Sequence, residues 1–161
     1  MSISVSQQFY HLIQKGTQQL GALCSLCDEE KAAIEAHSAE ELISIIERKR
    51  ALLADFADNV NARNQMLAEQ GLSPDPKGVS SLLERLAGGE RKAVADAWSR
   101  LEQALKEAAR LNERNEQIVL RSQKNLDQLL RIIRGQDVRT SLYNDAGIKG
   151  NYSAQNTLGK A

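Results

Sequence analysis

The stretch from residue 90 to residue 134 constrains the fold most, because it lacks glycine and proline and keeps a seven-residue apolar repeat throughout. Alternating steps of four and three residues predict one long helix with a single packing seam. At 1.5 Å per residue this helix is roughly 65 Å long, so its partners must also be long helices. The seam consists of Val94, Trp98, Leu101, Leu105, Ala108, Asn112, Asn115, Val119, Ser122, Leu126, Leu129 and Ile133. Its apolar character predicts burial along the whole helix.

The N-terminal part of the chain predicts a second long helix over residues 4–36. Ser4 and Gln7 form the pattern of a capping box, in which each side chain bonds the backbone N–H of the other residue. Gly16 and Gly21 lie inside this helix, and each costs about 1 kcal/mol relative to alanine. This helix should therefore be the least stable of the long helices unless close packing requires its glycines.

A further long helix is predicted over residues 38–70. Ser38 and Glu41 form a second capping-box pattern, and Gly71 supplies a helix stop. The link to the preceding helix is so short that the two helices must form an antiparallel hairpin. The seam of this helix consists of Leu42, Ile46, Lys49, Leu53, Phe56, Val60, Arg63 and Leu67.

The remaining segments complete an all-α fold. Prolines and glycines interrupt the chain after residue 71, and a short amphipathic helix is predicted over residues 79–87. The fold is expected to be an elongated antiparallel bundle of three long helices plus this short one, within residues 1–135. The periodic pattern stops beyond Gly135, and residues 136–161 are expected to form a flexible C-terminal tail.

Charge and composition exclude several classes of protein. The 21 basic and 21 acidic residues cancel, so the chain lacks the positive field expected of a nucleic-acid-binding protein. No apolar run approaches the roughly 20 residues that cross a bilayer, and the N-terminus does not have the pattern of a secretion signal. We therefore expect a cytoplasmic protein without membrane insertion.

Cys24 and Cys27 are the one motif with possible chemistry. A Cys-x-x-Cys pair binds zinc or acts in redox reactions, but a zinc site needs two more ligands. His11 and His37 lie roughly 20 and 15 Å from the pair along the helix, beyond coordination distance. We interpret both cysteines as core residues, with an intermolecular zinc or disulfide link as the alternative. No pattern of catalytic or phosphate-binding residues is present, so neither an enzyme nor a cofactor is predicted.

Polar residues interrupt the apolar seams, where they cost stability unless they are paired. If residues 38–70 and 90–134 run antiparallel with Gln70 near Glu90, the numbers of facing residues sum to roughly 160, an estimate from equal helical rise. This register places Lys49 beside Asn112 and Arg63 on the face of Trp98. The alternative is that both cations extend into solvent. The paired amides Asn112 and Asn115 are expected to fix the register.

The C-terminal tail carries scattered apolar side chains in a polar, glycine-containing sequence. They are too few to form a core, but they suit anchoring on another protein. The alternative is an ordinary frayed terminus. The candidate partner-binding residues are Leu142, Tyr143, Ile148, Tyr152 and Leu158.

The chain resembles the flagellar export chaperones of the FlgN family. The resemblance is carried by Lys49 with Leu52 and Leu53, by the segment 111–115 and by the segment 142–147. It implies a cytoplasmic chaperone that binds hook–filament junction proteins, prevents their premature assembly and delivers them to the flagellar type III export gate. It also implies that the C-terminal region holds the export substrate and that Tyr143 contacts the export gate.

Two other classes of protein fit the same pattern. In the first, the long seam is a coiled-coil oligomerisation element, for example of a homodimer, and binds no export substrate. In the second, the protein is an adaptor whose bundle face binds its partner.

Overall fold

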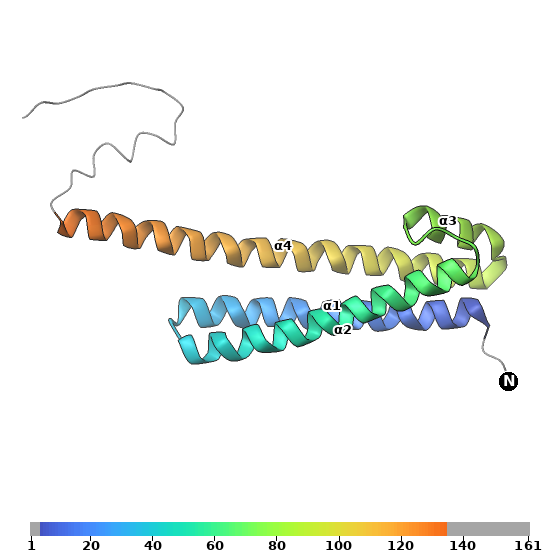
Figure 1. Cartoon of the computed structure of the whole chain (residues 1–161), viewed down its shortest axis with the longest axis horizontal. Helices are drawn as coiled ribbons and strands as arrows, with labels where there is room; N and C mark the ends of the chain where they lie inside the picture. The colour runs from blue at the N-terminus through green and yellow to red at the C-terminus, as the bar shows by residue number, and fades with distance from the viewer. Residues whose placement is uncertain (1–3, 135–161) are drawn as a thin grey trace, which may run out of the picture. The chain divides into compact units, whose positions relative to one another are not determined.

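The computed structural model describes residues 4–134, which form four helices and no strand (Figure 1). The helices are α1 (Val5–Glu35), α2 (Ala39–Glu69), α3 (Pro76–Arg85) and α4 (Gly88–Ile133). The predicted all-α fold with three long helices and one short helix is confirmed. The chain divides into two units, Met1–Val119 and Leu120–Ala161, which are described separately below.

The beginning of α1 has the predicted capping box. The Ser4 hydroxyl accepts a hydrogen bond from the Gln7 backbone N–H, and the Ser4 N–H donates to Gln7 Oε1, both at 3.3 Å. The second predicted capping box is wrong, because Ser38 makes no side-chain capping bond. Its backbone N–H, which Glu41 would have to bind, donates instead to the carbonyl oxygen of Ala33 at 3.0 Å.

The link between α1 and α2 depends on a left-handed residue at His37, with φ 54°. The His37 N–H donates to the Ile34 carbonyl, and the Ser38 N–H donates to the Ala33 carbonyl, which closes a Schellman motif. Glycine usually occupies this position, so a histidine there does not indicate a left-handed residue. Gly71 has the same role at the end of α2, where its φ is 68°. The prediction that Gly71 stops this helix is confirmed.

The short helix α3 begins at Pro76, three residues before the predicted start. Asp75 is its N-cap and accepts a hydrogen bond from the Gly78 N–H at 2.9 Å. Proline is favoured at the first helical position because its missing N–H has no partner there anyway. Gly78 is required, since a Cβ at this residue would lie 1.8 Å from the Ser73 carbonyl oxygen.

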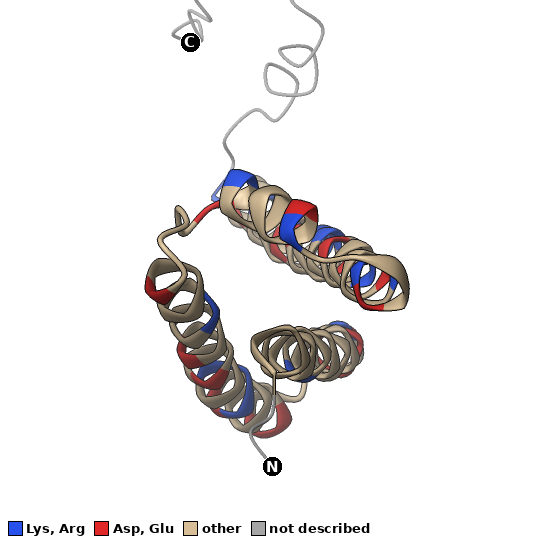
Figure 2. Ribbon diagram, turned by 90° about the vertical axis from the view of Figure 1, so that its right-hand side faces the viewer, with Lys and Arg blue, Asp and Glu red and all other residues tan. Residues whose placement is uncertain are grey.

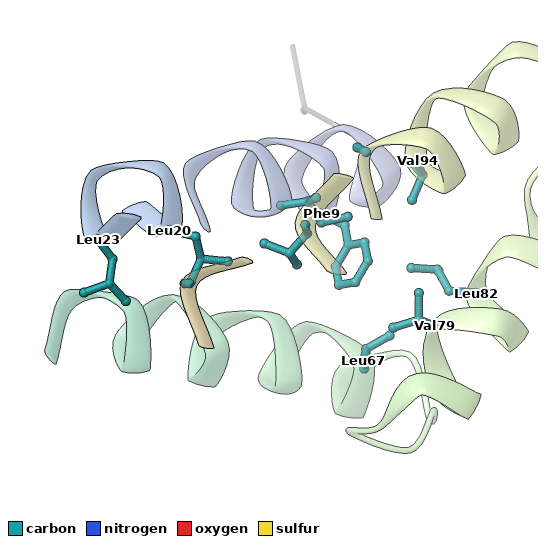
Figure 3. Close-up of a cluster of buried hydrophobic side chains, with 11 residues drawn as sticks. Phe9, Leu20, Leu23, Leu67, Val79, Leu82 and Val94 are labelled. Atoms are coloured by element: carbon teal, nitrogen blue, oxygen red, sulfur yellow. The ribbon is translucent and has the colours of Figure 1, made fainter. Parts of the chain in front are cut away.

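The main core lies where α3 closes one end of the bundle. Phe9 from α1 meets Leu67 from α2, Val79 and Leu82 from α3, and Val94 from α4 (Figure 3). All five side chains are buried. The core continues along the α1–α2 hairpin through Ile13, Leu20 and Leu23, so the hairpin and the first part of α4 share one apolar interior.

Gly16 permits a close approach of α1 to its neighbours. A Cβ at Gly16 would lie 2.8 Å from Asn59 Oδ1 of α2 and 3.2 Å from Leu101 Cδ1 of α4. The buried Asn59 donates from Nδ2 to the Leu12 carbonyl at 2.8 Å, while its Oδ1 accepts from Arg63 Nε at 3.0 Å. The amide is therefore fixed at both ends and cannot move away from an added methyl group.

The predicted seams are buried only in part. In α4, Val94, Leu101, Ala108 and Asn115 are buried, whereas Leu105 is half exposed. The prediction of burial along the whole helix is wrong for the later seam positions, which are exposed: Val119, Leu126, Leu129 and Ile133. The prediction for the α2 seam is also partly wrong, because two of its apolar residues, Ile46 and Leu53, are exposed, while Ile45 beside the seam is buried.

The two cysteines are free thiols in different environments. Cys27 is fully buried, as predicted, whereas Cys24 is only partly buried against the main core. Burial raises the pKa of both thiols, and for Cys24 the nearby carboxylates of Glu107 and Asp28 add to the rise.

Charged residues of both signs occur on the described helices. Figure 2 shows lysine and arginine interspersed with aspartate and glutamate on the same helices. Within residues 4–134, no helix combines the length and apolarity needed to span a bilayer.

The two glycines of α1 provide a matched test of the packing. We expect Gly16→Ala to lower the free energy of unfolding by about 1–3 kcal/mol, because the methyl group overpacks against Asn59 and Leu101. Gly21→Ala meets no atom within 4 Å and should raise this free energy by up to about 1 kcal/mol. Urea denaturation followed by circular dichroism measures both. Equal effects of the two substitutions would contradict this packing.

Candidate protein-binding surface

A polar cluster fixes the position of α4 on the α1–α2 hairpin, and Glu30 of α1 is its centre. Glu30 Oε2 accepts from Lys49 Nζ of α2 at 2.8 Å and from Asn115 Nδ2 of α4 at 2.7 Å. Lys49 Nζ also donates to Asn112 Oδ1 at 3.1 Å, which is the contact that the antiparallel register predicted. The cluster joins all three long helices at one level.

Asn115 has the further role of pairing a main-chain group of α1. Its Nδ2 donates to the Cys27 carbonyl oxygen at 2.6 Å, and its Oδ1 accepts from Arg114 Nε at 3.1 Å. Arg114 also forms an ion pair with Asp28 at 3.0 Å. Asn115 is only 3% exposed, so these bonds offset the cost of burying an amide.

The second predicted contact, between Arg63 and Trp98, is also present. The Arg63 guanidinium carbon lies 5.5 Å from the centroid of the Trp98 ring, and Phe9 stacks on the same indole with its centroid at 6.4 Å. Arg63 is only 7% exposed, which excludes its extension into solvent. Burial lowers the pKa of the Arg63 guanidinium, which nevertheless stays charged at neutral pH.

Sequence reasoning found the pairs that involve α2 and α4 but missed Glu30 and Asn59, which connect α1 to them. The partners of Lys49 and Arg63 were predicted from a single register, which aligned the end of α2 with the beginning of α4. No comparable estimate aligned α1 with α4. A signal was nevertheless present at Asn59, because a short amide in a long helix next to an apolar stripe needs partners when it is buried.

The second unit presents an apolar face at the end of α4. At about 100° per residue, Leu126, Leu129, Leu130 and Ile133 fall within a roughly 100° arc of the helix. We call these four residues the terminal apolar face. They are between 39% and 79% exposed. Large apolar side chains gathered on one helix face and left in solvent mark a site of protein interaction.

The opposite side of the same helical segment is basic. Residues 120–134 contain four basic residues and a single acidic one. The basic residues are Arg121, Lys124, Arg131 and Arg134, and the acidic residue is Asp127. The segment is therefore an amphipathic helix with a net positive polar side, which favours an apolar partner surface with acidic surroundings.

The five partner-binding residues predicted in the tail, Leu142, Tyr143, Ile148, Tyr152 and Leu158, lie outside the described residues. The terminal apolar face was not predicted as a binding site, because Leu126, Leu129 and Ile133 were assigned to the buried seam. Only the structure shows that the residues of the terminal apolar face are exposed, and this exposure identifies the face as a candidate binding site.

An all-α bundle with an exposed apolar helix end is the class of protein that the structure defines, and comparison with known proteins specifies it further. The FlgN protein family matches residues 1–150, so the chain belongs to this family. No curated protein matches the chain. The crystal structure of a protein identified as the flagella synthesis protein FlgN of Pseudomonas aeruginosa is similar, with 25% sequence identity and a TM-score of 0.63. The match covers 74% of this chain and 90% of the other chain. Membership of this family assigns the chain a role in flagellar assembly.

The terminal apolar face can be tested without a partner. We expect the double variant Leu126→Ser, Ile133→Ser to bind less of the apolar dye ANS, while its urea midpoint changes little because both side chains are exposed. The matched control is Lys124→Ser, Gln128→Ser on the opposite side of the helix, which should leave dye binding unchanged. A large loss of stability in the first variant would show instead that these side chains are buried.

Proposed function

We propose that the chain is a cytoplasmic export chaperone that binds hook–filament junction proteins and delivers them to the flagellar type III export gate. The proposal is supported by membership of the FlgN family and by likeness to a flagella synthesis protein. The observation that carries it is the terminal apolar face, because a chaperone needs an apolar surface that is accessible before its client arrives.

The mechanism that we propose has a fixed part and a binding part. The polar cluster around Glu30 and the Arg63–Trp98 contact hold the bundle of residues 4–119 in one register. The terminal apolar face and the residues Leu142, Ile148, Tyr152 and Leu158 form the client-binding region. This region would cover the surface through which the client assembles. Because the region loses conformational entropy when it becomes ordered on binding, the complex stays reversible. Tyr143 is the proposed contact with the export gate.

Two other functions fit the fold less well. A purely structural coiled coil would pair the seam of α4 with another chain, but the buried Asn115 of this seam bonds within the chain to Cys27 and Glu30 of α1. An adaptor that binds through the bundle alone would not need the terminal apolar face.

Deletion of residues 136–161 tests the client-binding region. We expect the truncated protein to keep nearly all its helix content in circular dichroism, because residues 4–134 contain the four described helices. It should no longer capture a purified hook–filament junction protein in a pull-down assay. Retained capture would refute the assignment of the client site to the tail.

A second arm of the same test separates the client from the gate. Tyr143→Ala should still capture the junction protein but should reduce its secretion from flagellated cells. Loss of capture by this variant would show that Tyr143 belongs to the client site and not to the gate contact.

A further inference from the structure

Two cavities lie one after the other between α2 and α4, well before the terminal apolar face. The first, of about 320 Å³, is lined by Phe56 and Arg63 of α2 and by Trp98 and Leu105 of α4, among others. The second, of about 310 Å³, is lined by α2 residues that include Ile46, Lys49 and Leu53, by Asn112 of α4 and by Glu30 of α1, which pairs with Lys49. We call this pair of cavities the α2–α4 groove.

The walls of the α2–α4 groove carry large apolar side chains without a covering partner in the described chain. Ile46, Leu53 and Leu105 are between 42% and 50% exposed. The α2 residues that line the two cavities extend from 46 to 67, which corresponds to roughly 30 Å of helix. This length fits one amphipathic helix, which would occupy the position of an additional helix in the bundle.

Arg63 gives the groove a chemical preference. It is buried, lines the first cavity and forms no ion pair with any described carboxylate. Its observed partners, the amide oxygen of Asn59 and the Trp98 ring, are both neutral. A buried charge normally has a counter-charge, because its desolvation is otherwise poorly compensated.

The two carboxylates that line the same cavity have other partners. Asp75 accepts hydrogen bonds from the Gly78 N–H and the Ser73 hydroxyl. Glu102 accepts from the indole N–H of Trp98 at 3.0 Å. Neither forms an ion pair with Arg63, so the guanidinium is left to pair with an acid from outside the described chain.

We propose that the α2–α4 groove binds an amphipathic helix of a partner protein, which packs its apolar row on Ile46, Leu53 and Leu105 and places one carboxylate beside Arg63. The groove consists of other residues than the proposed client-binding region, and its role does not depend on the proposed function. The carboxylate supplies the missing counter-charge in a desolvated site, where a paired guanidinium forms strong, directional hydrogen bonds.

Charge and sequence favour a different protein over the chain itself as the occupant. Residues 120–134, which carry the terminal apolar face, contain four basic residues and only Asp127 as an acid, so this segment of a second copy offers a single carboxylate for Arg63. Residues 136–161 contain Gly147, Gly150 and Gly159, which interrupt any apolar helix long enough to fill the groove.

Site-specific photocrosslinking of the full chain in flagellated cells tests the proposal. A benzoylphenylalanine in place of Leu105 reports from the groove, and the same residue in place of the exposed Gln103 reports from the opposite side of α4. We expect position 105, and not position 103, to crosslink to a helical segment of another protein. This segment should contain an aspartate or glutamate within one helical turn of the crosslinked residue. Crosslinks to a second copy, crosslinks to residues 135–161 or equal yields at both positions would overturn the proposal.

A double-mutant cycle then tests the carboxylate. The crosslinked segment is synthesised with its acid and with the matching amide, and each peptide is titrated against the wild-type chain and Arg63→Gln. We expect the acidic peptide to bind wild type about tenfold or more tightly than the amide peptide, and this preference to vanish in Arg63→Gln. An unchanged preference would overturn the role of Arg63. The variant Leu53→Ser, Leu105→Ser retains Arg63 and should weaken both peptides equally, which provides a second test if Arg63→Gln is unstable.

Discussion

The side-chain amide of Asn59 is the interaction on which the described bundle depends most. It is buried between α1 and α2, where its nitrogen donates to the Leu12 carbonyl and its oxygen accepts from Arg63. Only a glycine at position 16 leaves room for it. The same amide holds the guanidinium of Arg63 over Trp98, and it therefore helps to position α4. One polar group thus connects the close packing of the hairpin with the position of the third long helix.

This arrangement separates stability from binding. The polar contacts of the buried Asn59 and of the partly buried Glu30 lie within residues 4–119 and have specific partners. The exposed apolar side chains belong to other residues, on the terminal apolar face and along the α2–α4 groove. Polar contacts with defined partners fix the register of the helices, whereas exposed apolar side chains remain available for burial against another molecule. A chaperone of flagellar assembly requires both properties in one small chain.

The sequence predicted the helices well because strong local signals mark them. Ser4 with Gln7 and the turn glycine Gly71 define helix ends through bonds between residues close in the chain. The contacts of Lys49 with Asn112 and of Arg63 with Trp98 followed from a single antiparallel register. His37 was missed because its left-handed backbone is uncommon for a residue other than glycine.

Burial was predicted less well, for a geometric reason. A straight helix has 3.6 residues per turn, so a strict seven-residue seam drifts by about 20° per heptad. In α2 this drift accompanies the burial of Ile45 in place of Ile46, and it leaves Leu53 at the edge of the groove. The apolar residues at the end of α4 follow the same repeat as the buried ones, so periodicity alone does not distinguish a core from a binding surface. The candidate site could therefore not be located from the pattern.

Hydrogen–deuterium exchange of the full chain, free and bound to a purified hook–filament junction protein, tests whether the client binds at the terminal apolar face and the tail. We expect binding to slow exchange within residues 120–161, where the terminal apolar face and the proposed tail anchors lie. We also expect the amides around Glu30 and Asn59 to exchange slowly in both states, because the bundle is formed before the client binds. Binding that leaves exchange in residues 120–161 unchanged would contradict the account.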